Sequence, residues 1–409
     1  MDLLRMRAGR RRWRPLHRRS NWDWRGRDQG RHEAEGRGEA AMAKRRTPSR
    51  ATGPIATRPG AVHRSAAVRL RATILTLMVL AVAAALLVAL GSYRDYPVAA
   101  VVPPELEQQE NAIWLGYRWF SGAFSDAELL KLVERVRQHR FGYLLLNAGS
   151  LDAGGRLAQT RGEGLVKLLD ALHGAGYEGK VLAWLNGKNA EYGPGVDLED
   201  PEIRRAITAT VRELMVANSV DGIQLDIKSI RSGDPFFLAL LDEIRTNGLL
   251  PGQILSVAVR PLRSGWNGGW LRSDLATPDY LQEVAGRVDQ LAVLTYDSAL
   301  PLPGLYQRWL ESQVESVVNV AIAEVRRREE KYDSRDFSLL FAVPSFDDPR
   351  FTHWPVAENV VAASQALVAA FARCRERGEL PLQLKMGYSL YAEWTTDETE
   401  WQALGHLWS

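Results

Sequence analysis

SVDGIQLDIK, residues 219–228, is the stretch that decides the predicted fold of this chain. Alternation along an extended strand places Ile223, Leu225 and Ile227 on one face and Gln224, Asp226 and Lys228 on the other. A solvated strand would show the same alternation. The Asp221-Gly222 turn before the strand and the helix-like segment 235–247 after it favour a βαβ unit instead, in which the polar face lines the mouth of a barrel.

Short apolar runs and helix-like segments alternate through most of the chain. Eight strand candidates begin near Ile113, Tyr143, Val181, Gly222, Ile254, Gln290, Leu339 and Met386, a spacing that suits βα units. The chain has 409 residues, of which 46% are hydrophobic, and this is enough for one large domain with further segments. We therefore predict a (β/α)8 TIM barrel over residues 112–409.

Helix start signals agree with this arrangement at four places. Ser125 or Asp126 caps a helix through Arg137, Asp200-Pro201 opens one through Ala217, Pro355 opens one through Arg375, and Thr396-Asp397 begins the last. We expect the last helix to close the base of the barrel.

The motif DGIQLDIK resembles one found in family 18 glycoside hydrolases, the chitinases and their relatives. That family carries Asp-Gly-apolar-Asp-apolar-Asp-apolar-Glu on the fourth barrel strand, and Asp221, Gly222 and Asp226 match it. Gln224 replaces the middle aspartate. Lys228 stands at the position of the glutamate that donates the proton in the family.

Two further stretches carry the resemblance. Residues 288–297, VDQLAVLTYD, are similar to the sixth strand of the family, whose terminal Tyr-Asp pair holds the reacting sugar. Residues 391–395, YAEWT, are similar to the ending of glycoside-hydrolase-like bacterial barrels. The resemblance extends over residues 112–408 and implies a barrel that takes a glycan.

In the resembled family the glutamate protonates the leaving oxygen, and the neighbouring aspartate orients the acetamido group of the substrate. A lysine holds its proton too tightly to donate it efficiently near neutral pH. One interpretation of Lys228 is therefore a structural ion pair with Asp226. The other is that chemistry has moved to other carboxylates, of which Asp297 and Glu393 are the best placed. Glycosidases need two carboxyl groups about 5 to 10 Å apart, and the sequence does not measure that distance.

Barrel enzymes place their chemistry at the C-terminal ends of the strands and in the loops that follow. By this criterion the candidate catalytic residues are Asp226, Asp297 and Glu393. The candidate substrate-binding residues are Tyr117, Trp119, Asn147, Asn186, Lys228, Arg260, Tyr296, Tyr391 and Trp394, and Arg118, Asp347 and Asp348 also follow strand ends. Aromatic rings stack on the flat C–H faces of sugars, while amides and carboxylates bind hydroxyls.

The sequence has no histidine or cysteine spacing typical of a metal site and no phosphate-binding glycine motif in a strand–helix frame. We therefore expect no metal and no cofactor. Cys374 is the only cysteine, so no intrachain disulfide forms.

Residues 72–93 carry no charge and are rich in Leu, Val, Ala and Ile. At about 1.5 Å per residue such a helix is long enough to cross a bilayer core of about 30 Å. Residues 1–71 hold 20 Lys and Arg against 6 Asp and Glu, whereas residues 72–409 hold 32 against 43. The positive flank predicts a cytoplasmic N-terminus and an extracytoplasmic barrel, anchored in a bacterial-type inner or cytoplasmic membrane. A cleaved signal peptide is the alternative, because Ala89-Leu90-Gly91 is a small-x-small site.

The basic segment 1–71 has almost no apolar periodicity, so we expect a disordered tail. Its runs 10–12 and 44–46 are suited to contact with nucleic acid or anionic lipid. No folded reader accompanies them, so we expect no nucleic-acid partner and a solvated tail beside the membrane. Translation from Met42 is a second possible start. Residues 94–111, with prolines followed by glutamates, are predicted to be a linker.

Together these features predict a membrane-anchored barrel that binds a cell-envelope or exported polysaccharide, with hydrolysis lost or altered. Two alternatives stay open. One is an active glycosidase that uses Asp297 and Glu393, and the other is a non-catalytic interaction platform of the envelope, because a barrel fold alone does not choose among these functions.

Overall fold

The structure is a computed structural model that describes residues 61–92, 110–263, 275–333, 335–378 and 380–407. The predicted tail up to residue 60, with its alternative start at Met42, lies outside the described residues. So does the linker, except for residues 110 and 111.

Eight parallel strands form a closed barrel in which each strand pairs with the next along the chain and β8 pairs with β1. The strands are β1 (Ala112–Leu115), β2 (Tyr143–Ser150), β3 (Lys180–Lys188), β4 (Gly222–Lys228), β5 (Ile254–Val259), β6 (Gln290–Val293), β7 (Phe337–Pro344) and β8 (Leu384–Tyr391). Every strand lies where the apolar runs predicted one. The predicted (β/α)8 barrel is therefore confirmed.

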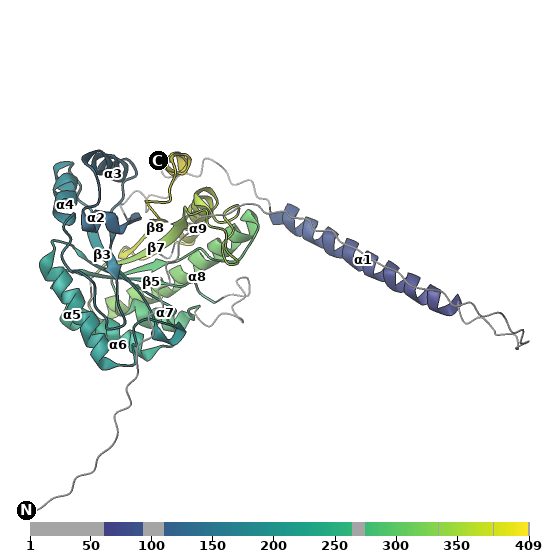
Figure 1. Ribbon diagram of the computed structural model, residues 1–409, viewed down its shortest axis with the longest axis horizontal. Coiled ribbons are helices and arrows are strands. Elements are labelled where there is room, and N and C mark those ends of the chain that lie inside the picture. Colours follow the sequence, from purple (N-terminus) through teal and green to yellow (C-terminus); the bar gives the residue numbers. More distant parts are fainter. Residues whose placement is uncertain (1–60, 93–109, 264–274, 334, 379, 408–409) are drawn as a thin grey trace, which may run out of the picture. The chain divides into compact units, whose positions relative to one another are not determined.

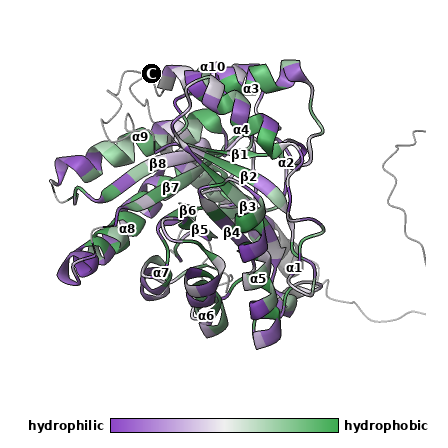
Figure 2. Ribbon diagram, turned by 90° about the vertical axis from the view of Figure 1, so that its left-hand side faces the viewer, coloured by the Kyte–Doolittle hydropathy of each residue, from purple (hydrophilic) through white to green (hydrophobic). Residues whose placement is uncertain are grey.

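Helices surround this barrel (Figure 1). They are α2 (Tyr117–Ser121), α3 (Asp126–Gln138), α4 (Leu165–Gly174), α5 (Pro201–Ala217), α6 (Pro235–Glu243), α7 (Pro278–Ala285), α8 (Pro303–Glu330), α9 (Val360–Glu376) and α10 (Glu398–Leu407), with a 3-10 turn η2 (Ala190–Tyr192) and a π turn η3 (Ile244–Gly248). Figure 2 shows that these helices mix polar and apolar residues, as expected of helices with one face on a sheet and the other in solvent.

Alternation along the strands fills two apolar compartments. Ile223, Leu225 and Ile227 of β4 pack between the sheet and the helices, as predicted. Side chains of the opposite parity, among them Trp114 and Trp184, fill the interior of the barrel. The strand alternation therefore directs the polar side chains of β4 inward, toward the mouth.

Gly222, the glycine of the Asp-Gly turn, permits the close approach of β4 to β5. A Cβ at this position would lie 2.1 Å from the carbonyl oxygen of Ile254. Only glycine fits between two backbones at that distance.

Three of the four predicted helix starts are confirmed by their caps. The Ser125 side chain accepts from the backbone N–H of Glu128, and Glu128 accepts from the backbone N–H of Ser125, which is a capping box. The Asp200 side chain accepts from the backbone N–H of Glu202, with Pro201 as the first helical residue. At the last of them, Asp397 accepts from the backbone N–H of Glu400 and Glu400 accepts from the backbone N–H of Asp397, so α10 begins at Glu398.

The predicted helix start at Pro355 is wrong. A turn closed by hydrogen bonds to the Trp354 carbonyl follows the proline. Asn359 then has extended backbone angles and caps α9 through its side chain, so α9 begins at Val360. The proline opens a turn, and the asparagine opens the helix, because an asparagine side chain satisfies an unpaired N–H of the first turn.

The predicted place of the last helix is also wrong. Helix α10 lies in the outer ring beside α9 and α3 rather than across the base (Figure 2). Arg135 of α3 forms an ion pair with Glu398 at 2.9 Å and stacks over the Trp401 ring. Trp401 is buried, and this aromatic contact holds α10 against the wall of the barrel.

Helix α1 (Ala61–Ser92) contains the predicted apolar segment but begins earlier than the expected span. Residues 61–71, which we expected in the disordered tail, are helical. The reason is that this segment has no proline or glycine and is rich in alanine, so a helix that starts in it propagates. Within α1, Arg69–Leu87 is long and apolar enough to cross a membrane by length and composition.

Candidate functional site

Strand β4 presents its inward polar side chains next to those of β3. Asn186 pairs in register with Asp226, and Lys188 pairs in register with Lys228. Asp226 is 5% exposed, whereas both lysines are exposed at the rim. The polar face predicted from the sequence therefore runs from a buried carboxyl group to two solvated ammonium groups.

Burial raises the pKa of the Asp226 carboxyl. The positive charges of Lys228 and Arg260 and the indole of Trp184 act in the opposite direction, but burial prevails. The Trp184 N–H does not reach hydrogen-bond geometry with any side chain in the described part of the chain. Lys228 and Asp226 form no ion pair within 4 Å, so the predicted direct pair is wrong. Lys228 is exposed at the strand end while Asp226 is buried, and the lysine charge acts on the Asp226 carboxyl group over a longer distance.

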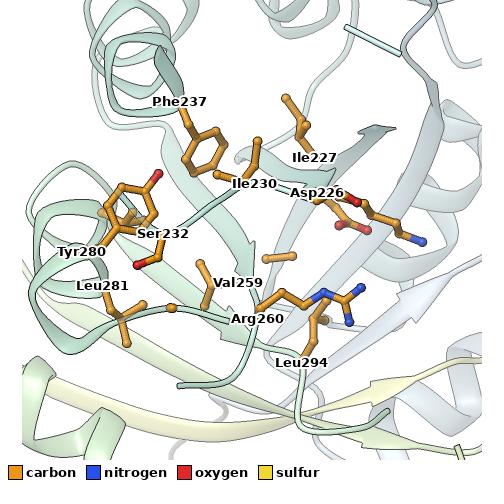
Figure 3. A pocket seen from close by; sticks show the side chains of 15 residues that line it. Asp226, Ile227, Ile230, Ser232, Phe237, Val259, Arg260, Tyr280, Leu281 and Leu294 are labelled. Carbon is orange, nitrogen blue, oxygen red and sulfur yellow. The ribbon is translucent and has the colours of Figure 1, made fainter. Parts of the chain in front are cut away.

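A narrow cavity of about 50 Å³ opens beside these residues. Figure 3 shows Asp226 and Arg260 pointing to one side of it, while Phe237, Tyr280 and Leu281 line the apolar part. A space of this size holds a few water molecules but not a sugar ring.

The end of β6 (Gln290–Val293) leads into Tyr296 and Asp297 at the centre of the mouth. Burial raises the pKa of the Tyr296 hydroxyl, and Tyr391, Asp226 and Asp297 raise it further. Asp297 has a φ of 57°, a left-handed conformation that aspartate tolerates better than most residues. Its carboxylate lies 3.9 Å from Arg260. Tyr296 thus lies among residues from four different strand ends, as the barrel topology predicted.

Glu358 holds the strained turn at Asp297 in place. One of its carboxylate oxygens accepts from the backbone N–H of Asp297 at 2.8 Å, and the other accepts from the backbone N–H and the hydroxyl of Ser298. His353 bonds the same carboxylate through Nδ1 at 2.8 Å and the carbonyl oxygen of Phe346 through Nε2 at 2.9 Å. Both side chains are fully buried. The network ties the ends of β6 and β7 to the start of α9.

Glu393 is already engaged on both of its oxygens. Arg118 donates to one at 2.7 Å, and the indole N–H of Trp119 donates to the other at 3.1 Å. Arg118 in turn reaches Glu128 of α3 at 2.8 Å. These contacts give the carboxylate a positioning role, because it holds α2 against the loop after β8.

Trp119 does not fit its predicted role as a substrate-binding residue. The Trp119 side chain is 0% exposed and packs against Phe124, and its indole N–H donates a hydrogen bond to Glu393. Spacing along the chain placed it after a strand end, but the short helix α2 turns its ring inward.

Aromatic rings form one side of the mouth. Trp394 is 46% exposed, lies nearly parallel to Trp184 at 6.5 Å between ring centroids, and meets Tyr391 edge to face at 5.8 Å. Trp114 of β1 packs edge to face on both Trp184 and Tyr391. We call Trp114, Trp184, Tyr391 and Trp394 the aromatic wall. Its buried members fix the orientation of the one ring that faces solvent.

The two predicted amides lie between β2 and β3. Asn147 accepts from the backbone N–H of Gly149, and Asn186 donates to the Gly149 carbonyl oxygen at 3.0 Å while accepting from Ser150. Both side chains are half-buried. They shape the strand ends beside Asp226, with part of each amide left accessible.

The other predicted residues lie further from the centre of the mouth. Tyr117, at the first position of α2, is 39% exposed and packs on Phe120. Asp347 and Asp348 are exposed in the loop after β7, and Asp348 lies 3.6 Å from Arg350. In the ranges that the structure describes, no three His, Cys, Asp or Glu side chains gather as a metal site would require.

Sequence reasoning missed three contributors, namely Trp114, His353 and Glu358. Trp114 could have been predicted as part of the mouth, because alternation along the first strand candidate points its side chain into the barrel. His353 and Glu358 follow no predicted strand end, and a single sequence does not mark them as partners. Only the fold brings that pair to the turn at Asp297.

The fold and the mouth define a (β/α)8 barrel with a mixed aromatic and charged rim. No family model matches the chain, and no curated protein is similar to it in sequence. Among solved structures the chain resembles chitinase-like glycoside hydrolases of family 18.

Three of these solved structures illustrate the likeness. The spore cortex-lytic enzyme SleL of Bacillus cereus has 12% identity and a TM-score of 0.47 over 73% of this chain and 74% of that chain. The C-terminal domain of a putative chitinase from Desulfitobacterium hafniense has 16% identity and a TM-score of 0.48 over 73% and 97%. A class V chitinase from Pseudomonas fluorescens has 12% identity and a TM-score of 0.47 over 73% and 99%.

We predict that Glu358→Gln destabilises the barrel by about 3 to 5 kcal/mol, because an amide N–H₂ would face N–H donors in a buried site. Thermal unfolding of the full chain in detergent, followed by tryptophan fluorescence, measures the loss. Glu376→Gln, an exposed glutamate at the end of α9, is the matched control and should unfold like the parent. Equal unfolding temperatures for the two variants would contradict the role assigned to Glu358.

Proposed function

We propose that the barrel binds a polysaccharide of the cell envelope, or one exported through it, across its mouth. The observation that carries this proposal is the aromatic wall, in which exposed Trp394 stands beside Tyr391 and next to the polar centre at Asp226 and Tyr296. A sugar ring needs both a flat apolar surface for its C–H face and directional partners for its hydroxyls. The mouth supplies the two side by side.

We propose further that hydrolysis in the manner of the resembled family is lost or altered. Lys228 stands where that family has its acid, and it extends into solvent above Asp226. The interpretation with relocated carboxylates receives little support from the geometry. Both oxygens of Glu393 accept from Arg118 and Trp119, and Asp297 lies between Arg260 and Thr352. Both carboxyl groups are therefore already engaged by neighbouring side chains.

The platform alternative predicts no glycan binding at all. The exposed ring of Trp394 argues against it, because an exposed aromatic ring beside polar groups suits the stacking of a sugar. Measuring whether the chain binds any glycan is enough to distinguish the glycan-binding proposal from the platform alternative.

The anchor is the third part of the proposal. Arg69–Leu87 of α1 has the length and composition to cross a bilayer, and the sequence before it is strongly basic. Positive flanks stay on the cytoplasmic side. We propose that α1 anchors the chain in the membrane with the barrel outside the cytoplasm.

Trp394→Ala and Asp297→Asn should each weaken glycan binding by about tenfold, which corresponds to one lost stacking or charge-assisted contact of about 1.4 kcal/mol. Both sites are partly accessible, and asparagine tolerates the left-handed backbone at position 297, so the unfolding temperature should change little. A glycan array followed by calorimetry on the full chain in detergent measures both quantities.

Tyr332→Asn is the control for these variants. Tyr332 is 97% exposed and follows α8, at the end of the barrel opposite the mouth. Its loss should leave binding unchanged. Unaltered affinity in Trp394→Ala and Asp297→Asn would place the binding surface elsewhere, and absence of binding by the parent to every glycan would favour the platform.

Lys228→Glu tests whether the departure at position 228 abolishes hydrolysis. The new carboxyl group would lie two residues from Asp226, so mutual repulsion favours a shared proton and one neutral acid. We expect detectable cleavage of N-acetylated glycans by the variant and none by the parent, in a reducing-sugar assay. Gln224 stays as a second departure and should keep the rate low. Activity of the parent that survives in Lys228→Ala would overturn the lost-acid proposal.

The membrane topology is tested by fusing, to the C-terminus, a reporter that is active only outside the cytoplasm. We expect an active fusion in the membrane fraction. An expressed but silent fusion would contradict export, and activity in the soluble extracytoplasmic fraction would indicate a cleaved signal peptide instead of an anchor.

A further inference from the structure

Two lysines stand side by side at the rim where β3 and β4 end. Lys188 and Lys228 are registered neighbours on parallel strands, and registered neighbours point to the same side of the sheet. The side chains below them, Trp184 and Gln224, point into the barrel. Both lysines therefore rise along the inner edge of the mouth.

This arrangement is unfavourable without a counter-ion. Like charges on neighbouring strands repel one another, and repulsion is strongest where the side chains are held in register. Among the described residues, no carboxylate lies within 4 Å of either ammonium group. The pair therefore has the charge that an anionic group at the mouth would complement.

Arg260 adds a third positive charge on the same side. It follows β5 and lines the narrow cavity together with Asp226 and Lys228, and Figure 3 shows its guanidinium beside the Asp226 carboxylate. Its guanidinium group lies 3.9 Å from the Asp297 carboxylate. The Asp226 carboxyl group is buried below these charges, whereas the two lysines reach solvent.

Acidic side chains do occur beyond the rim, in the loop after β3. Glu191, Asp197 and Glu199 line a neighbouring hollow with Arg231. Arg231 forms an ion pair with Glu191, and Asp197 accepts from the backbone N–H of Glu199. Arg231 belongs to the loop after β4, so these contacts engage Glu191 and Asp197 with groups other than the two lysines.

We propose that the glycan bound at the mouth carries an anionic group, and that Lys188 and Lys228 bind that group. The inference rests on the proposed glycan-binding function and specifies the class of polysaccharide. A carboxylate of a uronic acid, a sulfate ester and a phosphodiester share the required chemistry, since each accepts charge-assisted hydrogen bonds from ammonium groups. Residues 72–409 carry a net negative charge, so attraction of such a polymer is local to this rim.

The same proposal accounts for the residue at position 228. A glutamate there would repel an anionic sugar, whereas a lysine attracts it. The residue that excludes the acid chemistry of the resembled family thus supplies affinity for a different class of glycan.

The test compares the binding of oligosaccharides of equal length to the full chain in detergent. The panel holds a neutral N-acetylglucosamine oligomer, a polyuronate oligomer, a sulfated oligomer and a phosphodiester-linked oligomer. We expect at least one anionic oligomer to bind more tightly than the neutral one, with an affinity that falls as salt rises. Comparison of the polyuronate, sulfated and phosphodiester-linked oligomers identifies which anionic group is recognised.

The double variant Lys188→Met, Lys228→Met should lose about tenfold or more in affinity for the preferred anionic oligomer, and its salt dependence should flatten. Its affinity for the neutral oligomer should be unchanged, a result that a merely structural role of the lysines would not give. Lys131→Met on α3, whose lysine lies 3.9 Å from Glu398, is the matched control and should bind like the parent.

Equal binding of neutral and anionic oligomers, unaffected by the double variant, would overturn this inference while leaving glycan binding intact. Failure of every oligomer to bind the parent would contradict both the inference and the proposed function.

Discussion

The closed ring of eight strands is the constraint on which the rest of the structure depends. In a closed barrel every second side chain of each strand points into one shared interior, so polar residues of that parity are either buried or raised to the mouth. Strand β4 shows both outcomes. Gln224 is buried with no hydrogen-bond partner for its amide among the described residues, Asp226 is buried one layer above, and Lys228 reaches solvent. The alternation of side chains along each strand thus decides which polar groups lie at the mouth.

Rigid supports surround that chemistry. The Glu358 carboxylate holds the left-handed turn at Asp297, and Arg118 and Trp119 hold Glu393 beside the aromatic wall. Each support is buried or partly buried and satisfied by several donors, which fixes side chains more firmly than a single exposed contact would. The carboxylates of Glu358 and Glu393 therefore hold neighbouring groups in place through these hydrogen bonds.

The positively charged side chains of the mouth lie at two levels, one within the barrel end and one at the rim. Arg260 lies between Asp226 and Asp297, whereas Lys188 and Lys228 extend from the strand ends toward any ligand that crosses the mouth. Aromatic rings on one side and ammonium groups on another are the features on which we base the proposal of an anionic glycan. Such a surface needs no deep cavity, and the narrow space beside Asp226 indeed admits only small molecules.

The sequence by itself determined the barrel, the inward face of β4 and the apolar helix, because strand alternation, helix caps and a long uncharged run are periodic local signals. It also predicted that Asp226, Arg260, Tyr296 and Tyr391 lie together, since parallel strands in a barrel end at one face. Only the tertiary structure decided that Trp119 is buried, that Glu393 is engaged and that Glu358 supports Asp297. Those contacts join residues far apart in the chain, such as Arg118 and Glu393. A local sequence pattern does not indicate which distant residue will contact a given side chain.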